Sequence, residues 1–394
     1  MKWSTHFFFR LGGVDTGNIF SLKRRETCPI PFPITLRKKN VTVSNRSSYD
    51  VIVIGAGPAG ATAGYQLAQK GLDVLILEKK RLPRHKTCAG LISAKTAELL
   101  DFDISPVVEQ TINNIQFSFQ LKERFTKRSP VPVGYTVERD SFDYFLAMKA
   151  KEAGACIIDG KEVKKLEVLP NEVKVLTTNG IFTGLIIIGA DGACGITSRS
   201  VGLMKKVETR ITIEAKVSLS QKKMFQALDS TIQMDYGVMT GGYGWIFPKK
   251  RYLSVGAVAY PRFIKELKLY LQKLLSSPGL KSSSVNRFRS YPLPVRKAED
   301  PIQKKRILLL GDSAGLTDPL WGEGIYYAIK SAQLAGLVVE KCIKEGKMNL
   351  QPYQNLIDSQ IMPMFESSRT FLSFYSYFPH AFFDLLKRRQ NDSP

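Results

Sequence analysis

Asp50-Val51-Ile52-Val53-Ile54-Gly55-Ala56-Gly57-Pro58-Ala59-Gly60 is the stretch that decides how this chain folds. Its apolar half predicts a buried parallel strand, and the residues after it predict a helix over 58–70. A Gly-x-Gly-x-x-Gly turn between them permits a tight bend, lets the backbone approach a pyrophosphate and allows close helix–strand packing. Free N–H groups at the helix N-terminus would face the phosphates. The stretch therefore predicts a dinucleotide-binding turn.

A second strand is expected over 73–77, and Glu78 follows it, 23 residues after the first glycine. A carboxylate at this place accepts hydrogen bonds from ribose hydroxyls. We expect the phosphates and the ribose to be bound by Gly55, Gly57, Ala59, Gly60 and Glu78.

Apolar runs and helical patterns alternate further along the chain, as they do in an α/β sheet. Buried strands are expected over 181–190 and 307–310, and a helix begins at Arg139. A half-buried antiparallel strand is expected over 112–119, and short alternating strands lie within 205–295. We predict an α/β fold, in which a Rossmann-type domain carries an inserted, mainly antiparallel β domain and a C-terminal helical segment.

This pattern divides the chain into four parts. They are a basic N-terminal extension (1–48), a discontinuous cofactor domain (49–110, 136–204 and 296–345), a substrate domain (111–135 and 205–295) and an aromatic, basic C-terminal segment (346–394). The extension is rich in Ser, Thr, Lys and Arg and poor in acid, which is typical of an organellar transit peptide. An over-extended start or a disordered arm explains it equally well.

The composition narrows the class of partner. Lys and Arg number 57 against 35 Asp and Glu, a net charge of +22, which favours anionic partners. No basic run is interleaved with the aromatic pattern of an RNA-binding module, so we expect no nucleic acid. The five cysteines contain no CxxC pair, which favours a reducing compartment, and we expect no metal site. No apolar run is long enough to span a bilayer.

A second motif separates FAD from NAD. Gly311-Asp312-Ser313-Ala314-Gly315 follows an apolar strand about 250 residues after the first turn, and two distant phosphate-and-sugar motifs imply an extended cofactor. The pairing resembles the flavoprotein family of aromatic hydroxylases and geranylgeranyl reductases. The resemblance implies FAD, with its ribityl chain bonded by Asp312. The residues it places at the isoalloxazine ring are Pro319, Gly322, Gly324 and Ile325.

Three further segments resemble the geranylgeranyl reductase branch of that family. Pro83-Arg84-His85-Lys86-Thr87-Cys88-Ala89-Gly90 is similar to a segment that lies beside the flavin, and Arg139 matches a cofactor-contacting arginine. Tyr243-Gly244-Trp245-Ile246-Phe247-Pro248 resembles the YxWxFP signature of the substrate domain. The resemblance implies that FAD is contacted by Cys88, Ala89 and Arg139, and the substrate by Tyr243, Trp245, Phe247 and Pro248.

Two motifs depart from the family pattern. The signature normally closes with Gly-x-Gly, but here Gly256-Ala257-Val258 stands, which would place the backbone slightly further from the ligand. After Asp191 and Gly192, the usual Ser is Gly195, and the usual Arg is displaced by one position to Arg199. We expect Asp191 and Val163 to contact the cofactor and assign no such role to Arg199.

The resemblance implies an FAD-dependent oxidoreductase acting on CH–CH groups, which saturates the isolated double bonds of a geranylgeranyl chain. The chain would be borne by a lipid, a diphosphate or a chlorophyll-type pigment. Reduced flavin would give hydride to one alkene carbon while a proton reaches the other. Cys88 and Tyr243 are the candidate catalytic residues, and His85 or an ordered water stay open as proton donors. No second nucleotide motif is visible, so electrons would come from NAD(P)H or a reduced ferredoxin.

Other activities share this cofactor frame. The main alternative is a flavin-dependent monooxygenase of a hydrophobic substrate, and a flavoprotein of isoprenoid cyclisation is another. Flavin halogenases carry a Trp-x-Trp-x-Ile-Pro motif reminiscent of 243–248, although Tyr243 and Phe247 fit the reductase version better. A lipid-binding protein that keeps FAD for structure alone is the non-enzymatic alternative.

The C-terminal segment is dense in aromatic residues from Phe371 to Phe383 and ends in Leu385-Leu386-Lys387-Arg388-Arg389. Burial against the body is one interpretation. A peripheral membrane contact is the other, with aromatic side chains at the lipid interface and basic ones at anionic head groups. We expect a cytoplasmic protein that can associate with a membrane, or a plastid protein if the extension is a transit peptide. The sequence does not indicate an oligomeric state.

Overall fold

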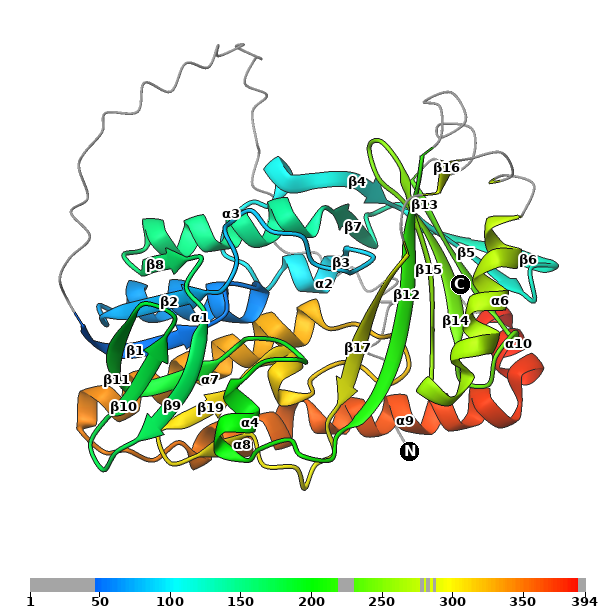
Figure 1. Ribbon diagram of the computed structural model, residues 1–394. Helices are drawn as coiled ribbons and strands as arrows, with labels where there is room; N and C mark the ends of the chain where they lie inside the picture. The colour runs from blue at the N-terminus through cyan, green and yellow to red at the C-terminus, as the bar shows by residue number, and fades with distance from the viewer. Residues whose placement is uncertain (1–46, 219–229, 277–279, 281–283, 286–287, 389–394) are drawn as a thin grey trace, which may run out of the picture.

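The computed structural model describes residues 47–218, 230–276, 280, 284–285 and 288–388. Two large sheets lie beside each other, and helices pack below and around them (Figure 1). This mixed α/β architecture with C-terminal helices confirms the predicted fold class. Nearly all of the N-terminal extension lies outside the described residues.

The first sheet contains the nucleotide turn and is mainly parallel. Its strands are, in order, β18 (Gln303–Lys304), β19 (Ile307–Leu309), β11 (Gly180–Gly189), β1 (Ser48–Ile54), β2 (Val74–Glu78) and β8 (Cys156–Asp159), with β10 (Val173–Thr177) paired to β11 and β9 (Val163–Val168) paired to β10. Central β1 pairs in parallel with both β2 and β11. Because it is buried on both faces, it reads in the sequence as an unbroken apolar run.

Helices and a hairpin cover the two faces of this sheet. One face packs against α1 (Pro58–Gln69), α3 (Arg139–Glu152) and α7 (Ile325–Glu345). The other face packs against side chains of β9 and β10, beside the short helix α4 (Thr197–Val201). The N-termini of α1 and α7 therefore both lie at the carboxyl end of the parallel strands, where open α/β sheets bind ligands.

The second sheet is mainly antiparallel. Its strands are, in order, β16 (Ser284–Val285), β12 (Glu208–Ser218), β15 (Leu253–Ala259), β14 (Tyr243–Pro248), β13 (Thr231–Tyr236), β5 (Asn114–Phe119) and β6 (Glu123–Arg128), with β17 (Arg289–Val295) beside β12. Its outer face packs against α6 (Ile264–Leu275). Its inner face is turned toward the first sheet and the C-terminal helices. The strands come from the two segments that the sequence assigned to a substrate domain, and the domain limits themselves stay a prediction.

One predicted strand starts two residues later than expected. Of residues 112–119, Asn114–Phe119 form β5, whereas Ile112 belongs to β4 (Val108–Ile112), in a small sheet with β7 (Gly134–Val137) and β3 (Leu91–Ser93). The short helix α2 (Ala94–Ala97) follows β3. The break falls at Asn113, where the N–H groups of Asn113 and Asn114 both donate to the Ser230 carbonyl and the chain enters the second sheet. There β5 runs antiparallel to β6 but parallel to β13.

Three C-terminal helices connect the two halves of the molecule: α8 (Gln351–Gln360), α9 (Met362–Tyr377) and α10 (Pro379–Arg388). Figure 1 shows α9 running below the second sheet, between α8 near the first sheet and α10. Its first turns place Met362 and Phe365 in the core of the first domain. Its last turns place Leu372 and Tyr375 in the core under the second sheet. The helix therefore fixes the two halves in relation to each other.

A fully buried arginine makes a second connection between the halves. Arg210 of β12 donates to the carbonyls of Pro319, at 2.6 Å, Leu320, at 3.4 Å, and Gly241. Three carbonyls are strong partners for one guanidinium, and no other side chain presents so many donors in a fixed plane. Arg210 thus holds the loop that precedes α7 against the second sheet.

We expect Arg210→Met to lower the free energy of unfolding by about 3 kcal/mol, because buried carbonyls would lose their charged donor. The urea midpoint of the purified chain measures this. Arg262→Met is the matched control, since Arg262 is exposed beside the rings of Tyr260 and Phe263 and its loss should cost less than about 0.5 kcal/mol. Equal midpoints for the two variants would contradict the assignment.

Candidate functional site

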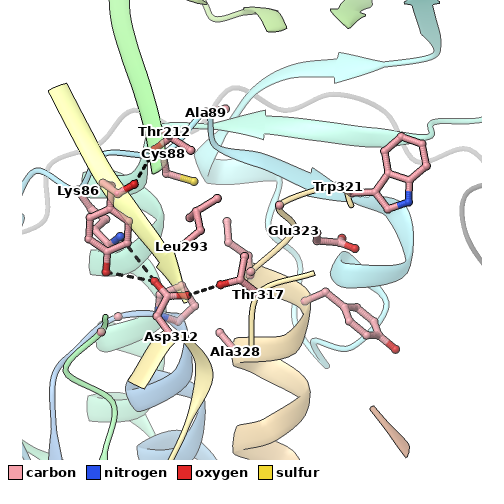
Figure 2. Close-up of a pocket in the computed structure, with 18 of the residues that line it drawn as sticks. Lys86, Cys88, Ala89, Thr212, Leu293, Asp312, Thr317, Trp321, Glu323 and Ala328 are labelled. Carbon is pink, nitrogen blue, oxygen red and sulfur yellow. Dashed lines mark hydrogen bonds and ion pairs between the residues drawn. The ribbon is translucent and has the colours of Figure 1, made fainter. Parts of the chain in front are cut away.

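A cavity of about 1730 Å³ lies between the two sheets and the C-terminal helices. Its lining is mainly apolar and comes from both halves of the molecule. It brings together most of the predicted site residues: Gly55, Gly57, Ala59, Glu78, Cys88, Ala89, Arg139, Val163, Asp191, Asp312, Gly322, Gly324, Ile325, Tyr243, Trp245 and Phe247. Gly60, Pro319 and Pro248 are not among its lining residues. Figure 2 shows the chamber where the two halves meet.

The Gly-rich turn forms one end of the cavity. Gly55 has φ +104°, and a Cβ there would lie 2.4 Å from the Ala190 carbonyl oxygen. A Cβ on Gly60 would lie 1.9 Å from the Gly55 carbonyl oxygen, so that glycine serves helix–strand packing. No side chain caps the N-terminus of α1, and Gly57 and Ala59 line the cavity. The first N–H groups of α1 are therefore available to a phosphate.

Glu78 stabilises this turn through its carboxylate. Its carboxylate accepts the N–H of Ala56 at 3.0 Å and that of Lys80 at 3.1 Å. Arg84 Nε lies 3.0 Å from the same carboxylate. Glu78 is only 4% exposed but still lines the cavity, so it can both hold the turn and face a ribose.

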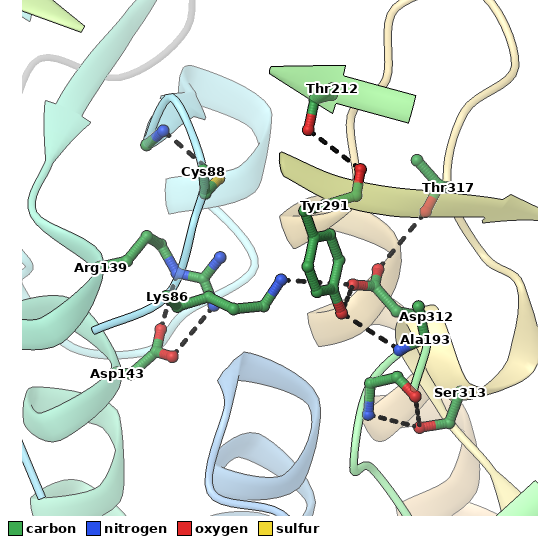
Figure 3. Close-up of polar contacts among 12 residues, drawn as sticks. Lys86, Cys88, Arg139, Asp143, Ala193, Thr212, Tyr291, Asp312, Ser313 and Thr317 are labelled. Atoms are coloured by element: carbon green, nitrogen blue, oxygen red, sulfur yellow. Dashed lines mark hydrogen bonds and ion pairs between the residues drawn. The ribbon is translucent and has the colours of Figure 1, made fainter. Parts of the chain in front are cut away.

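A buried carboxylate next to the turn holds two arginines. Asp143 of α3 is fully buried, with Arg84 Nη1 at 2.9 Å. Arg139 Nε lies 2.8 Å from the same carboxylate (Figure 3). Burial alone would lower the pKa of Arg139, but the Asp143 carboxylate and the contact with Cys88 raise it. Both arginines line the cavity and Asp143 does not, so this wall, which we call the cationic wall, presents two guanidinium groups to a bound anion.

Asp312 lies at the centre of a second polar cluster (Figure 3). Tyr291 donates its hydroxyl to Asp312 Oδ2 at 3.2 Å and accepts the Ala193 N–H at 3.1 Å. Lys86 Nζ lies 3.0 Å from the centroid of the Tyr291 ring and 3.8 Å from the Asp312 carboxylate. Burial lowers the pKa of Lys86 to about 8, although Asp312 acts in the opposite direction. The cluster can bind a hydroxylated chain through Asp312.

Asp191 is engaged by its own surroundings. It accepts the Thr197 N–H at 2.9 Å, the Thr197 hydroxyl at 3.0 Å and the Ser313 hydroxyl at 3.1 Å. A Cβ on Gly195 would lie 2.1 Å from the Asp191 carboxyl carbon, so a serine there would collide with it. This explains why Gly195 stands where the family usually has Ser. Arg199 is exposed and donates to the Cys194 carbonyl at 3.4 Å.

The loop 318–324 approaches the cavity from the other side. Asp318 is fully buried and accepts the N–H groups of Leu320, at 2.8 Å, and Trp321, at 2.7 Å, and the Ser368 hydroxyl at 2.7 Å. Burial raises its pKa to about 6. No side chain caps α7 after Gly324, so a second helix N-terminus opens on the same cavity. Pro319 contributes its carbonyl to Arg210 rather than a surface to the cavity.

The second sheet lines the other end of the cavity with alternating apolar residues. They are Tyr243, Trp245 and Phe247 of β14, Ile232 and Met234 of β13, and Ile115 and Phe117 of β5. Alternate residues share one face of a strand, so one register places all of them inside. Tyr243 donates its hydroxyl to the Trp321 carbonyl, and burial raises its pKa. Pro248 directs its carbonyl to the Thr136 hydroxyl at 2.8 Å.

Cys88 and Ala89 lie where the polar and apolar ends meet (Figure 2). The Cys88 N–H donates to Glu214 Oε1 at 3.1 Å, and the Gly90 N–H donates to Cys88 Sγ at 3.3 Å. His85 is exposed, and burial of part of its ring lowers its pKa.

Sequence analysis missed several residues of the site, namely Arg84, Lys86, Asp143, Glu214 and Tyr291 as individual contributors. Three of them stand inside or beside quoted motifs, and their role follows only from the fold. For Glu214, the sequence pattern suggested a position on the solvent-facing side of a strand. Polar and apolar residues alternate along β12, which is the pattern of a solvent-facing strand. The polar face carries Glu208, Arg210, Thr212, Glu214 and Lys216, and the apolar face carries Ile211, Ile213 and Ala215. Here that polar face is turned toward the first domain.

Two helix N-termini without side-chain caps, a cationic wall and a long apolar end together fit a dinucleotide with an aromatic ring system. Among the described residues, no group of three or more His, Cys, Asp or Glu side chains is placed to hold a metal ion. No helix in the described part of the chain is long and apolar enough to cross a bilayer.

The FAD binding domain family matches residues 48–350. An uncharacterised protein of Methanosarcina barkeri is 32% identical over 314 residues, which cover 80% of each chain. The digeranylgeranylglycerophospholipid reductase of Methanocaldococcus jannaschii is 29% identical over 314 residues, covering 75% of this chain and 78% of that one. The chloroplastic geranylgeranyl diphosphate reductase of Nicotiana tabacum is 27% identical over 350 residues, covering 81% and 73%.

Solved structures show the same fold. A geranylgeranyl bacteriochlorophyll reductase-like protein from Thermoplasma acidophilum has a TM-score of 0.76 at 24% identity, covering 84% of this chain and 88% of that one. The halogenase PltM has a TM-score of 0.68 at 19% identity, covering 83% and 76%. The sequence relatives show the family as well as the fold. The chain belongs to the FAD binding domain family and, within it, to the geranylgeranyl-reductase-like FAD-dependent oxidoreductases.

Proposed function

We propose that this enzyme reduces the isolated carbon–carbon double bonds of a geranylgeranyl chain. The observation that carries the proposal is the shape of the cavity, in which an apolar end is continuous with the end that fits FAD. An isoprenoid chain has no hydrogen-bonding groups, so its site must be apolar along its length. The inward residues of β5, β13 and β14 provide such a wall.

Bound FAD, once reduced, would supply hydride to one carbon of the double bond. The chain's own residues do the rest. Trp245 and Phe247 line the apolar end and exclude water, which strengthens electrostatic stabilisation of positive charge at the other carbon. Tyr243 holds the Trp321 carbonyl, and so fixes the loop 318–324 at the junction. We assign Tyr243 a positioning role, because its proton is engaged there.

The carrier of the prenyl chain and the electron donor are part of the proposal. Relatives are named for a digeranylgeranylglycerophospholipid and for geranylgeranyl diphosphate, and the structural neighbour for a bacteriochlorophyll. We propose a lipid carrier first, since archaeal lipid reductases recur among the relatives. A diphosphate or a pigment carrier is the alternative. NAD(P)H or a reduced ferredoxin is the proposed source of electrons.

A flavin-dependent monooxygenase or halogenase is the second candidate, because the halogenase PltM shares the fold. The two activities differ in what oxidises the reduced flavin. We expect the photoreduced enzyme, without oxygen, to be reoxidised by a geranylgeranyl phospholipid or diphosphate, with the product gaining pairs of hydrogen atoms. Flavin absorbance and product mass measure this. Reoxidation only after oxygen is admitted, with an oxygen or halogen atom in the product, would contradict the reductase.

The cationic wall generates a prediction about the cofactor. We expect Asp143→Ala to retain less FAD than the wild type and to unfold at lower temperature, because two buried guanidinium groups would lose their counter-ion, at a cost of about 3–5 kcal/mol. The ratio of flavin to protein absorbance and the melting temperature measure these effects. Glu152→Gln, on the same helix with a side chain 64% exposed, is the control. Wild-type retention and stability in Asp143→Ala would contradict the role of Asp143.

We also propose that the enzyme takes its substrate from a membrane surface. Exposed residues of α9 and α10 line the cavity, among them Phe371, which is 40% exposed, and Leu385, which is 37% exposed. Tyr377 and Phe378 continue this apolar rim and are 80% and 61% exposed. Lys387 and Arg388 follow directly in α10, although Lys387 also pairs with Glu123. Aromatic side chains beside basic ones fit the interface of an anionic bilayer.

We expect the full chain to sediment with vesicles that contain anionic phospholipid, and the double variant Phe371→Ser/Phe378→Ser to do so several-fold less. Each lost ring removes apolar area from the lipid interface. Leu269→Ser is the matched control, because Leu269 is 61% exposed on α6, away from the rim. Equal sedimentation of the double variant and the control would contradict the membrane contact.

A further inference from the structure

We infer that Glu214 stores the proton that is added to the double bond, and passes it to the cavity through the thiol of Cys88. The inference rests on the proposed reduction and names a residue that neither the sequence motifs nor the comparisons assign. In the balanced step, the S–H bond of Cys88 breaks as a C–H bond forms on the carbon that does not receive hydride. The O–H bond of Glu214 then breaks to restore the S–H bond, and solvent reprotonates Glu214.

The position of Glu214 is the first observation. It lies on the polar face of β12, opposite Gly256 on one side and Arg289 on the other. Its Oε1 accepts the Cys88 N–H at 3.1 Å, which holds the carboxyl against this residue. The Cys88 sulfur itself points into the chamber between Ala89 and Leu293 (Figure 2). Glu214 is 8% exposed and lines the main cavity, so it is close to the reacting end but shielded from bulk water.

A second, small cavity behind Glu214 is the second observation. Its volume is about 10 Å³, which is close to what one water molecule needs. Polar side chains line it, and they include Glu214, Cys88, His85, Lys216 and Tyr252. His85 is exposed and the Lys216 side chain is 38% exposed, so the small cavity leads from the carboxyl to solvent. It offers a path for reprotonation that does not cross the substrate end.

The charges around Glu214 are consistent with a proton store. The groups that face it are Lys86, His85, Arg139, Glu138, Asp140, Lys216, Lys249, Tyr252 and Arg289. Burial nevertheless raises the pKa of Glu214, although the Cys88 N–H and the lysines act in the opposite direction. Burial also lowers the pKa of Lys249 to about 8, which weakens its hold on the carboxylate. Burial lowers the pKa of His85, which favours the neutral imidazole, in which one ring nitrogen donates and the other accepts.

The other side chains in the cavity that could donate a proton are hydrogen-bonded or ion-paired to other groups. Tyr243 donates its hydroxyl to the Trp321 carbonyl. Glu323 is paired with Lys95 at 2.9 Å, and Glu78 with Arg84 at 3.0 Å. Asp312 accepts from Tyr291 and faces Lys86. Each of these groups therefore already has a charged or hydrogen-bonding partner other than Cys88.

The test compares Glu214→Gln with Glu208→Gln. Glu208 lies on the same face of β12 but is paired with Arg369 away from the chamber. We expect both variants to retain FAD. We expect Glu214→Gln to slow reoxidation of the photoreduced flavin by the prenyl substrate by about a hundred-fold or more, the usual effect of losing a general acid. The wild-type rate should fall as pH rises through the raised pKa of Glu214, and this fall should be absent in Glu214→Gln.

A second measurement does not depend on turnover. We expect the infrared difference spectrum between acidic and alkaline protein to contain C=O bands of carboxyls that keep their protons above the usual range, and Asp318 contributes one of them. One band should be lost in Glu214→Gln and kept in Glu208→Gln. A wild-type rate and pH profile in Glu214→Gln would overturn the inference, as would a set of bands that the substitution leaves unchanged. If no prenyl substrate reoxidises wild-type flavin, the proposed reaction fails, and the infrared band still decides whether Glu214 stores a proton.

Discussion

The buried Asp143 carboxylate is the interaction on which the cofactor end of the molecule depends. Through Arg84 it is connected to Glu78 and the Gly-rich turn, and through Arg139 to Cys88. One line of charges therefore runs from the expected ribose site to the junction with the apolar end. A buried ion pair costs much of what it gains, so its value lies in geometry more than in stability. If Asp143, Arg84 or Arg139 moves, the Gly-rich turn, the cationic wall and the Cys88 thiol are no longer held in fixed positions relative to one another.

The apolar end depends on a different constraint. Two halves with separate cores must be held in a fixed relative position across a large cavity. Arg210 and α9 both do this. Arg210 fixes the loop before α7 to the second sheet through backbone carbonyls. The α9 helix places side chains in both cores, and its Ser368 bonds the buried Asp318 of the same loop. The loop 318–324 is thus clamped twice, and Tyr243 adds a third contact through Trp321.

Sequence reasoning reached the fold class because local patterns agree with the global structure at the decisive places. The strand–turn–helix from 48 to 69 is local, so its residues alone reveal it. The start of the strand predicted over 112–119 was wrong by two residues, because alternation continues across Asn113, while the change of sheet is set by the distant Ser230 carbonyl. The same limit applies to the site. Lys86, Tyr291 and Asp312 meet only after about 200 residues of intervening chain have folded between them. No pattern of spacing encodes such a cluster.

The polar face of β12 carries sequence information that belongs to none of the motifs. An alternating polar strand normally faces water, since desolvating a charge without a partner costs several kcal/mol. The same pattern inside a molecule requires partners for every charge, and β12 finds them in succession. Glu208 meets Arg369, Arg210 meets backbone carbonyls, and Lys216 meets Glu138. Glu214 alone in this series meets a backbone N–H at the edge of the reaction chamber, with its pKa raised. That difference within one strand separates a side chain that holds the fold from one that can exchange a proton.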